Sequence, residues 1–469
     1  MVWKFNLYKE KLAALDDKGG AIKYGELIEL ANDIQEICHR ALAFNLCQNS
    51  IGSMAGYVAM MNAGVVPVMI AEDMDRSLLD ALMRQYKPEY MWIPEERASE
   101  FSEMRIELKR YGYVLVSTNY GQESQLYKDL ALLLTTSGST GSPKLVRQSY
   151  QNIRANTESI VEYLKLDSTE RPITTLPMNY TYGLSIINSH LYVGATILIT
   201  DKTLVQKEFW HFLREEKATS FGGVPYTYEM LKKLRFFNMP NDSIRTMTQA
   251  GGKLSPELHR EFAEYAKKTG KQFVVMYGQT EATARMAYLP AERSLDKYGS
   301  MGIAIPGGKF VLIDVEGEEI DKANVVGELV YEGKNVTLGY AMNREDLSKG
   351  DERLGKLVTG DMAKRDEEGF YYIVGRKKRF LKMFGKRVNL DEVDMLIKEE
   401  FVDMDCASTG SDDHMHIFVT DSEKLEDVKR FIVEKTHLNG VAVEVDAIEK
   451  VPRNEAGKVI YAELEKLFD

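Results

Sequence analysis

Short β-rich runs alternate with amphipathic helical stretches along most of this chain, and this alternation restricts the fold to the α/β class. Helical periodicity covers residues 24–41 and 150–164, whereas residues 132–135 and 196–200 have the composition of strands. Ser149 is the expected N-cap of the second helix. The strand at 132–135 and the glycine-rich turn after it are therefore expected beside a helix.

The length of the chain and a change of texture near Gly375 predict two domains. A chain of 469 residues exceeds what one hydrophobic core usually covers. After Gly375 comes the basic run 376–379, then an amphipathic helix, a strand at 415–420 and a second helix. We expect a large N-terminal domain, residues 1–375, and a small α+β domain, residues 376–469.

One uncharged stretch, residues 54–71, is long enough to be flagged as a membrane span. Asn62, Gly64 and Pro67 interrupt it. We therefore predict a buried helix, a turn at residues 63–64 and a strand at 66–70, with no membrane span.

The overall charge and the cysteines favour a cytoplasmic protein that does not bind nucleic acid. The formal net charge of −11 and the pI near 5.4 argue against a generally cationic surface. Cys38, Cys47 and Cys406 are too few and too scattered for a disulfide framework or a spaced zinc site, which indicates a reducing compartment. The first residues carry no secretory signal, and the seven histidines predict no metal set.

The segment from Thr136 to Lys144, Thr-Ser-Gly-Ser-Thr-Gly-Ser-Pro-Lys, concentrates glycines and hydroxyls directly after an apolar strand. Glycines let successive backbone N–H groups turn toward an anion, hydroxyls add donors and Lys144 adds charge, so the loop can bind phosphate. Its spacing differs from that of the Walker loop and of the dinucleotide motif Gly-x-Gly-x-x-Gly. Glycine- and serine-rich segments are also common in flexible surface loops, so this segment alone does not identify a function.

A second segment, Tyr-Gly-Gln-Thr-Glu-Ala from Tyr277 to Ala282, follows the strand-like run 273–276. It places an aromatic ring, a hydroxyl and a carboxylate at the end of a strand, where α/β sheets bind ligands. Tyr277 can stack on a base, Thr280 can bond a phosphate, and Glu281 can hold Mg²⁺. A tyrosine considered alone is more often a core aromatic with a solvated hydroxyl.

Two weaker signals come from the last third of the chain. Asp361, in Thr-Gly-Asp, is expected in a short turn before a hairpin, where its carboxylate can accept both hydroxyls of a ribose. Lys458 follows a glycine in a segment expected to be a mobile loop. A turn aspartate is usually only a turn former and a loop lysine is usually solvated.

These four segments, in this order, resemble the adenylate-forming superfamily of acyl-CoA synthetases, adenylating domains and luciferases. The resemblance extends through Gly251-Gly252, the run from 327–329 to 339–340, and Gly375-Arg376. It covers essentially the whole chain and is most specific from Thr136 to Lys458. It implies a large N-terminal domain of multiple α/β layers and a small C-terminal domain that is mobile.

The resemblance also implies ATP and Mg²⁺ as cofactors and assigns a role to each motif residue. Tyr277 is expected against adenine, Thr280 at the α-phosphate, and Glu281 as the Mg²⁺ ligand. The ATP phosphates are expected at Thr136, Ser137, Gly138, Ser139, Thr140, Gly141 and Lys144.

The remaining roles fall near the domain boundary and the C-terminus. By the same resemblance, Asp361 and Arg376 hold the ribose, and Lys378 matches the hinge position. Lys458 matches the lysine that bridges the acid carboxylate and the α-phosphate during adenylation. Arg379 departs from the family, which often has an acidic residue there.

The acid pocket implied by the resemblance is apolar and aromatic, which suits a small carboxylic acid. The motif 177–183 has Tyr180 where many members have histidine, and residues 177–189 lack the aspartate that pairs an amino group in amino-acid-activating members. The expected lining residues are Tyr180, Tyr182, Gly183, Ile186, Val224 and Gly252.

The resemblance leaves the acceptor open between CoA and the phosphopantetheine of a free-standing carrier protein, and an amine acceptor is also compatible with it. A degenerate nucleotide-binding regulator is a further alternative, against which Glu281 and Lys458 are both present. A simple ATPase or kinase predicts a Walker or kinase-type loop, which this sequence lacks.

Overall fold

The computed structural model describes residues 2–121, 125–135, 144–384, 386–436, 438–453 and 459–467. These residues form two compact units. The larger contains the described residues up to 309 together with 331–357, and the smaller contains 310–330 together with those from 358 onward. The domain boundary predicted at residue 375 and the mobility of the C-terminal domain stay predictions.

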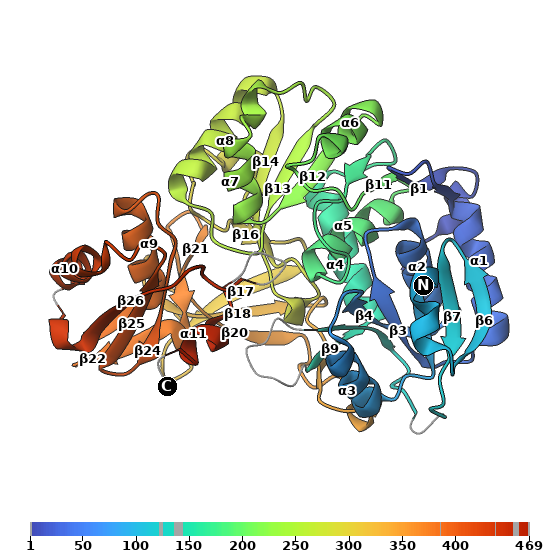
Figure 1. The fold of residues 1–469 in the computed structure, drawn as a ribbon. Coiled ribbons are helices and arrows are strands. Elements are labelled where there is room, and N and C mark those ends of the chain that lie inside the picture. The colour runs from blue at the N-terminus through green and yellow to red at the C-terminus, as the bar shows by residue number, and fades with distance from the viewer. Residues whose placement is uncertain are drawn as a thin grey trace. The chain divides into compact units, whose positions relative to one another are not determined.

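Two sheets form the framework of the larger unit (Figure 1). In the described residues, one sheet has nine strands, in the spatial order β16 (Ile303–Ala304), β15 (Ala287–Tyr288), β14 (Gln272–Tyr277), β13 (Thr246–Gln249), β12 (Ser220–Gly223), β10 (Pro172–Ile173), β11 (Ile197–Ile199), β1 (Leu12–Asp16) and β2 (Ala21–Lys23). The other described sheet has eight, in the order β19 (Gly339–Ala341), β9 (Leu145–Ser149), β8 (Leu130–Thr135), β4 (Val66–Ala71), β3 (Leu42–Cys47), β5 (Tyr90–Pro94), β7 (Tyr113–Ser117) and β6 (Arg105–Arg110).

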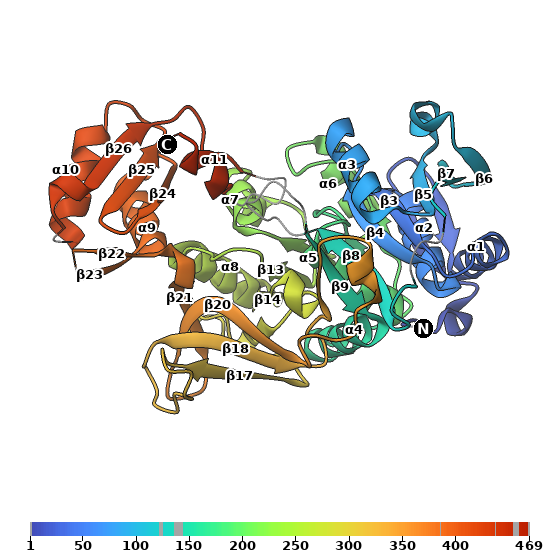
Figure 2. The ribbon, with the colours of Figure 1, turned by 90° about the horizontal axis from the view of Figure 1, so that it is seen from below.

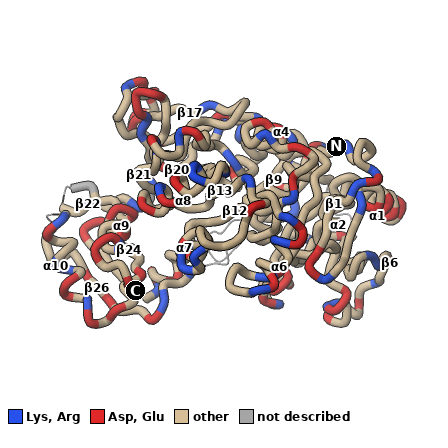
Figure 3. Tube along the Cα trace, turned by 90° about the horizontal axis from the view of Figure 1, so that it is seen from above, with Lys and Arg blue, Asp and Glu red and all other residues tan. Residues whose placement is uncertain are grey.

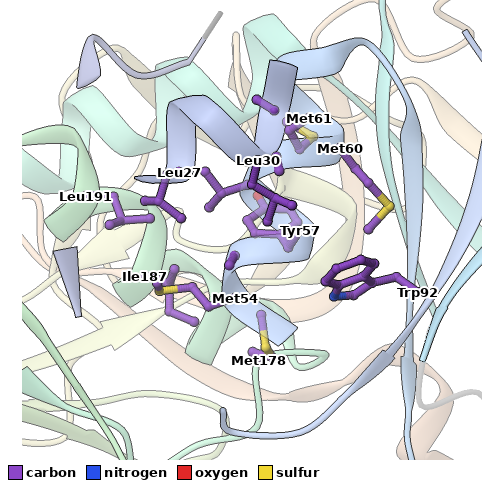
Figure 4. Close-up of a cluster of buried hydrophobic side chains, with 14 of the residues drawn as sticks. Leu27, Leu30, Met54, Tyr57, Met60, Met61, Trp92, Met178, Ile187 and Leu191 are labelled. Carbon is purple, nitrogen blue, oxygen red and sulfur yellow. The ribbon is translucent and has the colours of Figure 1, made fainter. Parts of the chain in front are cut away.

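Helices connect and cover these strands. They are α1 (Tyr24–Ile37), α2 (Ile51–Ala63), α3 (Arg76–Tyr86), α4 (Tyr150–Leu164), α5 (Thr181–Tyr192), α6 (Lys207–Glu215), α7 (Pro225–Lys233) and α8 (Pro256–Thr269). The main core cluster joins side chains of α1, α2 and α5 with residues of both sheets (Figure 4). These helices therefore form a layer between the sheets, as expected for a multilayer α/β domain.

Helix α2 is the most deeply buried of this layer and corresponds to the apolar stretch 54–71. It is buried from Ile51 to Met61 and ends at Gly64, whose φ of 79° is left-handed, before β4 begins at Val66. The predicted helix, turn and strand are confirmed. In the part of the chain that the structure describes, no helix is long and apolar enough to cross a membrane.

Other local predictions agree to within a few residues. Helix α4 covers 150–164, and the Ser149 side chain accepts from the backbone N–H of Asn152 as its N-cap. Helix α1 begins at Tyr24 as predicted but ends at Ile37, because Cys38 already has extended dihedrals on the way into β3.

The smaller unit contains most of a four-stranded sheet, in which β20 and β21 are antiparallel, and an α+β body (Figure 2). The sheet contains β17 (Gly308–Ile313), β18 (Gly327–Gly333), β20 (Lys356–Arg365) and β21 (Tyr371–Arg376). The body contains β22 (Phe380–Met383), β23 (Lys386–Asn389), β24 (Cys406–Ser411), β25 (His414–Val419), β26 (Val443–Ala447), α9 (Leu390–Glu400), α10 (Leu425–Thr436) and α11 (Tyr461–Glu465). One apolar cluster joins α9 and α10 to the strands of the body, and it includes Cys406, which is buried as predicted.

Two predictions in this unit need correction or comment. Asp361 lies inside the long strand β20, not in a turn, and is paired with Arg376 on β21. The turn is predicted because glycine favours turns, and Gly360 does have a left-handed φ of 73° within this strand. Arg379, the departure from the family pattern, is partly buried and forms ion pairs with Asp391 and Asp394.

Charged residues are distributed along both units. Acidic residues outnumber basic ones, 71 to 60. Figure 3 shows the two kinds interspersed along the trace instead of gathered in one segment. The absence of a nucleic-acid partner remains an expectation from the acidic composition.

Candidate active site

Some of the predicted site residues of the larger unit lie at one edge of the nine-stranded sheet, whereas Tyr182, Gly183 and Ile186 lie on helix α5. Strands β10, β12, β13 and β14 are parallel neighbours. Their carboxyl ends therefore lie at the same edge, where open α/β sheets bind ligands. Val224 follows β12, Gly252 follows β13, and the segment from Tyr277 to Glu281 follows β14.

Glu281 is held firmly at this edge, on the short 3-10 helix η4 (Thr280–Ala282). Its carboxylate Oε1 accepts a hydrogen bond of 2.7 Å from the Tyr340 hydroxyl. Its backbone carbonyl accepts from the Thr337 amide at 3.0 Å and the Thr337 hydroxyl at 2.9 Å, and also from Arg353 at 3.2 Å. No described residue bonds Oε2, so that oxygen remains available to a ligand.

Tyr340 connects this carboxylate to two cations. The Lys144 ammonium lies 3.8 Å from the centroid of the Tyr340 ring and the Arg353 guanidinium carbon 4.7 Å from it, within the range of cation–π attraction. Burial and the nearby Glu281 carboxylate raise the pKa of the Tyr340 hydroxyl well above its usual range. Tyr340 therefore stays neutral and acts as a hydrogen-bond donor.

The turn after Glu281 has a strained backbone. Thr283 has φ of 66° and ψ of −41°, which is rare for a β-branched residue. Its hydroxyl donates to the Asn335 carbonyl at 2.7 Å, and its own carbonyl accepts from the Thr181 hydroxyl. Because bonds from both sides enforce this conformation, the turn is fixed before any ligand binds.

The other two predicted nucleotide residues of this segment lie beside Glu281. Tyr277 is half-buried at the end of β14, and its hydroxyl accepts from the Gln279 amide at 3.3 Å. Thr280 is likewise half-buried. Both side chains thus have part of their surface open to a ligand.

Most of the residues predicted to line the acid pocket lie close together in the structure. Tyr182, Ile186 and Val224 are buried in one cluster, against which Tyr180 packs. The Tyr182 hydroxyl bonds the Thr248 hydroxyl at 2.8 Å.

The glycines of this region are places of close approach. A Cβ at Gly251 would stand 2.6 Å from the Tyr180 hydroxyl, and one at Gly183 would overlap the Pro177 carbonyl. Gly252 is exposed and lies beside Pro225, so it belongs to the rim instead of the buried wall.

In the smaller unit the two residues predicted to hold the ribose form an ion pair. Arg376 Nε lies 2.7 Å from Asp361 Oδ1. Asp361 is buried, whereas the Arg376 side chain is 54% exposed. Lys378 lies in the 3-10 helix η7 (Lys377–Arg379).

Several predicted residues lie outside the described residues. They are Thr136, Ser137, Gly138, Ser139, Thr140, Gly141 and Lys458.

Sequence reasoning missed Thr337, Arg353 and the role of Tyr340. These residues reach Glu281 because β19 pairs with β9, a register that brings Tyr340 opposite Val146. No local pattern reveals such a pairing.

It also missed a possible set of metal ligands on the smaller unit. His416, Glu444 and Asp446 offer ligand atoms within 4.8 Å of one another on β25 and β26, with both carboxylates exposed. Exposed carboxylates are well solvated, so this set alone does not establish a metal site.

Comparisons with known proteins agree on the class of this chain. Residues 44–341 match the family model described as AMP-binding enzyme. A long-chain-fatty-acid–CoA ligase of Bacillus subtilis is 29% identical over 69% of this chain, and the match spans 56% of that relative. A 2-succinylbenzoate–CoA ligase of Bacillus cereus is 25% identical over 90% of this chain and 88% of the relative.

Solved structures show the same fold over nearly the whole length. ATP-bound MatB from Rhodopseudomonas palustris is 22% identical with a TM-score of 0.77, covering 98% of this chain and 96% of that one. O-succinylbenzoate coenzyme A synthetase from Bacillus subtilis, in complex with ATP and magnesium ion, is 21% identical with a TM-score of 0.77, covering 98% of both chains. The chain belongs to the AMP-binding enzyme family, within the superfamily of acyl-CoA ligases.

Proposed function

We propose that this protein converts a small carboxylic acid and ATP into an acyl adenylate and pyrophosphate, and then transfers the acyl group to the thiol of CoA. The observation that carries the proposal is the group formed by Glu281, Tyr340, Lys144 and Arg353, which combines one available carboxylate oxygen with two cations. Both curated relatives named above are ligases of an acid and CoA.

The residues present fit a magnesium ion bound with nucleotide phosphates. Mg²⁺ is usually held by one or two carboxylates together with substrate phosphates and water. Glu281 Oε2 supplies such a carboxylate oxygen, because Oε1 is engaged by Tyr340. When bound, the ion neutralises charge on the phosphate oxygens.

In the first step the acid carboxylate attacks the α-phosphorus, and the bond from that phosphorus to the leaving pyrophosphate breaks. Two anions must approach each other, so fixed cations and N–H donors lower the barrier. We assign this work to Lys144, Thr280 and the loop 136–141, with Lys458 bridging the carboxylate and the α-phosphate. Tyr277 binds the adenine ring, and Asp361 with Arg376 binds the ribose.

In the second step a thiolate attacks the acyl carbon and AMP leaves. The acid pocket formed by Tyr180, Tyr182, Ile186 and Val224 orients the acyl chain. Its apolar and aromatic lining disfavours an amino acid.

Acid-dependent exchange of labelled pyrophosphate into ATP tests the first step. We would assay short aliphatic, hydroxylated and aromatic acids with the wild-type protein and with Lys458→Ala. We expect exchange with at least one acid and a loss of ~10²–10³-fold in the variant, because one aimed charge is removed. A variant rate within a few-fold of the wild type contradicts the role of Lys458.

The acceptor requires a separate assay. Incubating the active acid with ATP and either CoA or a phosphopantetheinylated carrier protein shows which thiol receives the acyl group. We expect acyl-CoA. Acylation of the carrier protein alone would replace CoA in the proposal, and the absence of exchange with any acid would favour an AMP-binding regulator.

A further inference from the structure

One buried cation in the larger unit has no anionic partner. Three arginines are buried among the described residues. Arg344 is paired with the buried Glu89 at 2.5 Å, and Arg147 is paired with Glu352. Arg285, which is 3% exposed, has no carboxylate partner in the part of the chain that the structure describes.

The neighbours of Arg285 are all neutral. Its Nε donates to the Ser185 hydroxyl at 3.2 Å, and its Nη1 donates to the Tyr163 hydroxyl at 3.0 Å and contacts the Met276 sulfur at 3.1 Å. No described group accepts from Nη2. A buried charge without a counter-ion is costly, and removing it from water is compensated only in part by neutral hydrogen bonds.

The position of Arg285 connects this charge to the acid pocket. Its guanidinium carbon lies 5.1 Å from the centroid of the Tyr182 ring. Tyr182 and Met276 belong to the apolar cluster that also contains Ile186 and Val224. Arg285 therefore borders the predicted pocket from the loop that also carries Glu281.

The effect of Arg285 on its neighbours supports an uncompensated positive charge. Burial raises the pKa of Tyr182 and of Tyr163, and in both cases the charge of Arg285 opposes that rise. Arg285 thus places a positive charge beside the apolar cluster that contains Tyr182.

We infer that Arg285 binds a second carboxylate of the substrate, so that the acid activated by this protein is a dicarboxylic acid. The inference rests on the proposed function and specifies its substrate. One carboxylate reacts at the α-phosphorus, and the other pairs with the guanidinium. Arginine is well suited to this because charge-assisted hydrogen bonds to carboxylates are strong in a buried site.

Matched pairs of acids test this inference. Pyrophosphate exchange would be measured with succinate and butyrate, glutarate and pentanoate, adipate and hexanoate, and phthalate and benzoate. For the best pair we expect the wild type to favour the diacid by ~10²-fold or more in kcat/KM, because the monoacid leaves the buried charge unpaired. In Arg285→Met that preference falls by ~10²-fold.

A matched control separates charge from packing. Ser185→Ala removes a hydrogen bond of Arg285 but keeps the guanidinium, so we expect the diacid preference to stay within about threefold. If Arg285 were only structural, Arg285→Met would lower kcat/KM equally for the diacid and the monoacid of a pair. That result, or a wild-type preference for the monoacid in every pair, overturns the inference while leaving the proposed function intact.

Equilibrium binding decides the inference without turnover. Isothermal titration calorimetry of the same acids, with wild type and Arg285→Met, requires no adenylation. Diacid binding that weakens ~10²-fold in the variant supports the role of Arg285 even if no acid supports exchange. Equal binding by both proteins, or no diacid binding by the wild type, refutes it.

Discussion

At the scale of single residues, the site is defined by how Glu281 is held. The sequence predicts its type and its place at the end of a strand. It does not predict the contacts with Tyr340, Thr337 and Arg353, because these come from a separate stretch of chain that reaches Glu281 through the β9–β19 pairing. Local motifs therefore predict which residue carries the chemistry, but they do not predict the contacts from distant strands that hold its side chain in place.

The Tyr340 hydroxyl offers a direct test of this support. Tyr340→Phe removes the hydrogen bond to Glu281 but keeps the ring that Lys144 and Arg353 contact. Groups that orient a metal-binding carboxylate commonly contribute 10–100-fold to affinity or activity. We expect pyrophosphate exchange to fall ~10-fold or more and to need a higher Mg²⁺ concentration.

Tyr340→Leu is the companion variant, since it removes the hydroxyl and the ring together. A further loss relative to Tyr340→Phe would measure the cation–π contribution. Unchanged exchange and an unchanged Mg²⁺ requirement in Tyr340→Phe would show that Glu281 needs no such support.

At the scale of elements, helices with a clear period are predicted best. Helix α4 matches its prediction at both ends, because the Ser149 cap and the apolar period specify it locally. Strand β20 is the contrary case. The Thr-Gly-Asp sequence favours a turn, but residues 359–361 lie within β20, where Asp361 pairs with Arg376 of β21.

His259 on helix α8 forms two hydrogen bonds, to Gly299 and Ser294, that are expected to depend on pH. Its Nδ1 accepts from the Gly299 amide at 3.2 Å, so Nε2 carries the proton and donates to the Ser294 hydroxyl at 2.9 Å. Burial lowers the pKa of His259 to about 4 from 6.5. The unfolded chain therefore takes up a proton below pH 6.5 that the folded protein takes up only near pH 4.

The expected result is a loss of stability on acidification. The contribution of His259 is fully present above pH 6.5 and decreases by up to ~1.4 kcal/mol per pH unit as the pH falls toward 4. His190, whose pKa burial also lowers to about 4, acts in the same direction. In urea unfolding experiments between pH 7 and 5, the free energy of unfolding should depend less steeply on pH in His259→Gln than in the wild type. An identical slope of unfolding free energy against pH in both proteins would contradict this contribution of His259.

At the scale of the whole molecule, we propose that the two units have different tasks. In this proposal the larger unit binds the acid and the phosphates, and the C-terminal part presents different residues in the two steps. The extent of each unit could be foreseen only roughly, because residues 310–330 group with the C-terminal part and not with their neighbours in sequence.

A proline at the proposed hinge tests this division of labour. Proline fixes φ near −65° and restricts the preceding residue, so Lys378→Pro should prevent the backbone rotation between the steps. We expect pyrophosphate exchange to remain within about fivefold of the wild type and acyl-CoA formation to fall more than tenfold. Equal losses in both assays would argue against a hinge at Lys378, and Lys377→Ala serves as the control for the neighbouring charge.

The distribution of tryptophan gives the larger unit its own optical signal. Trp3, Trp92 and Trp210 are the three tryptophans of the chain, all are buried, and all belong to that unit. Indole emission therefore reports the unfolding of one unit, whereas far-ultraviolet circular dichroism reports both. Denaturation curves that coincide by the two methods would mean that the units unfold together, and separated midpoints would give each unit its own stability.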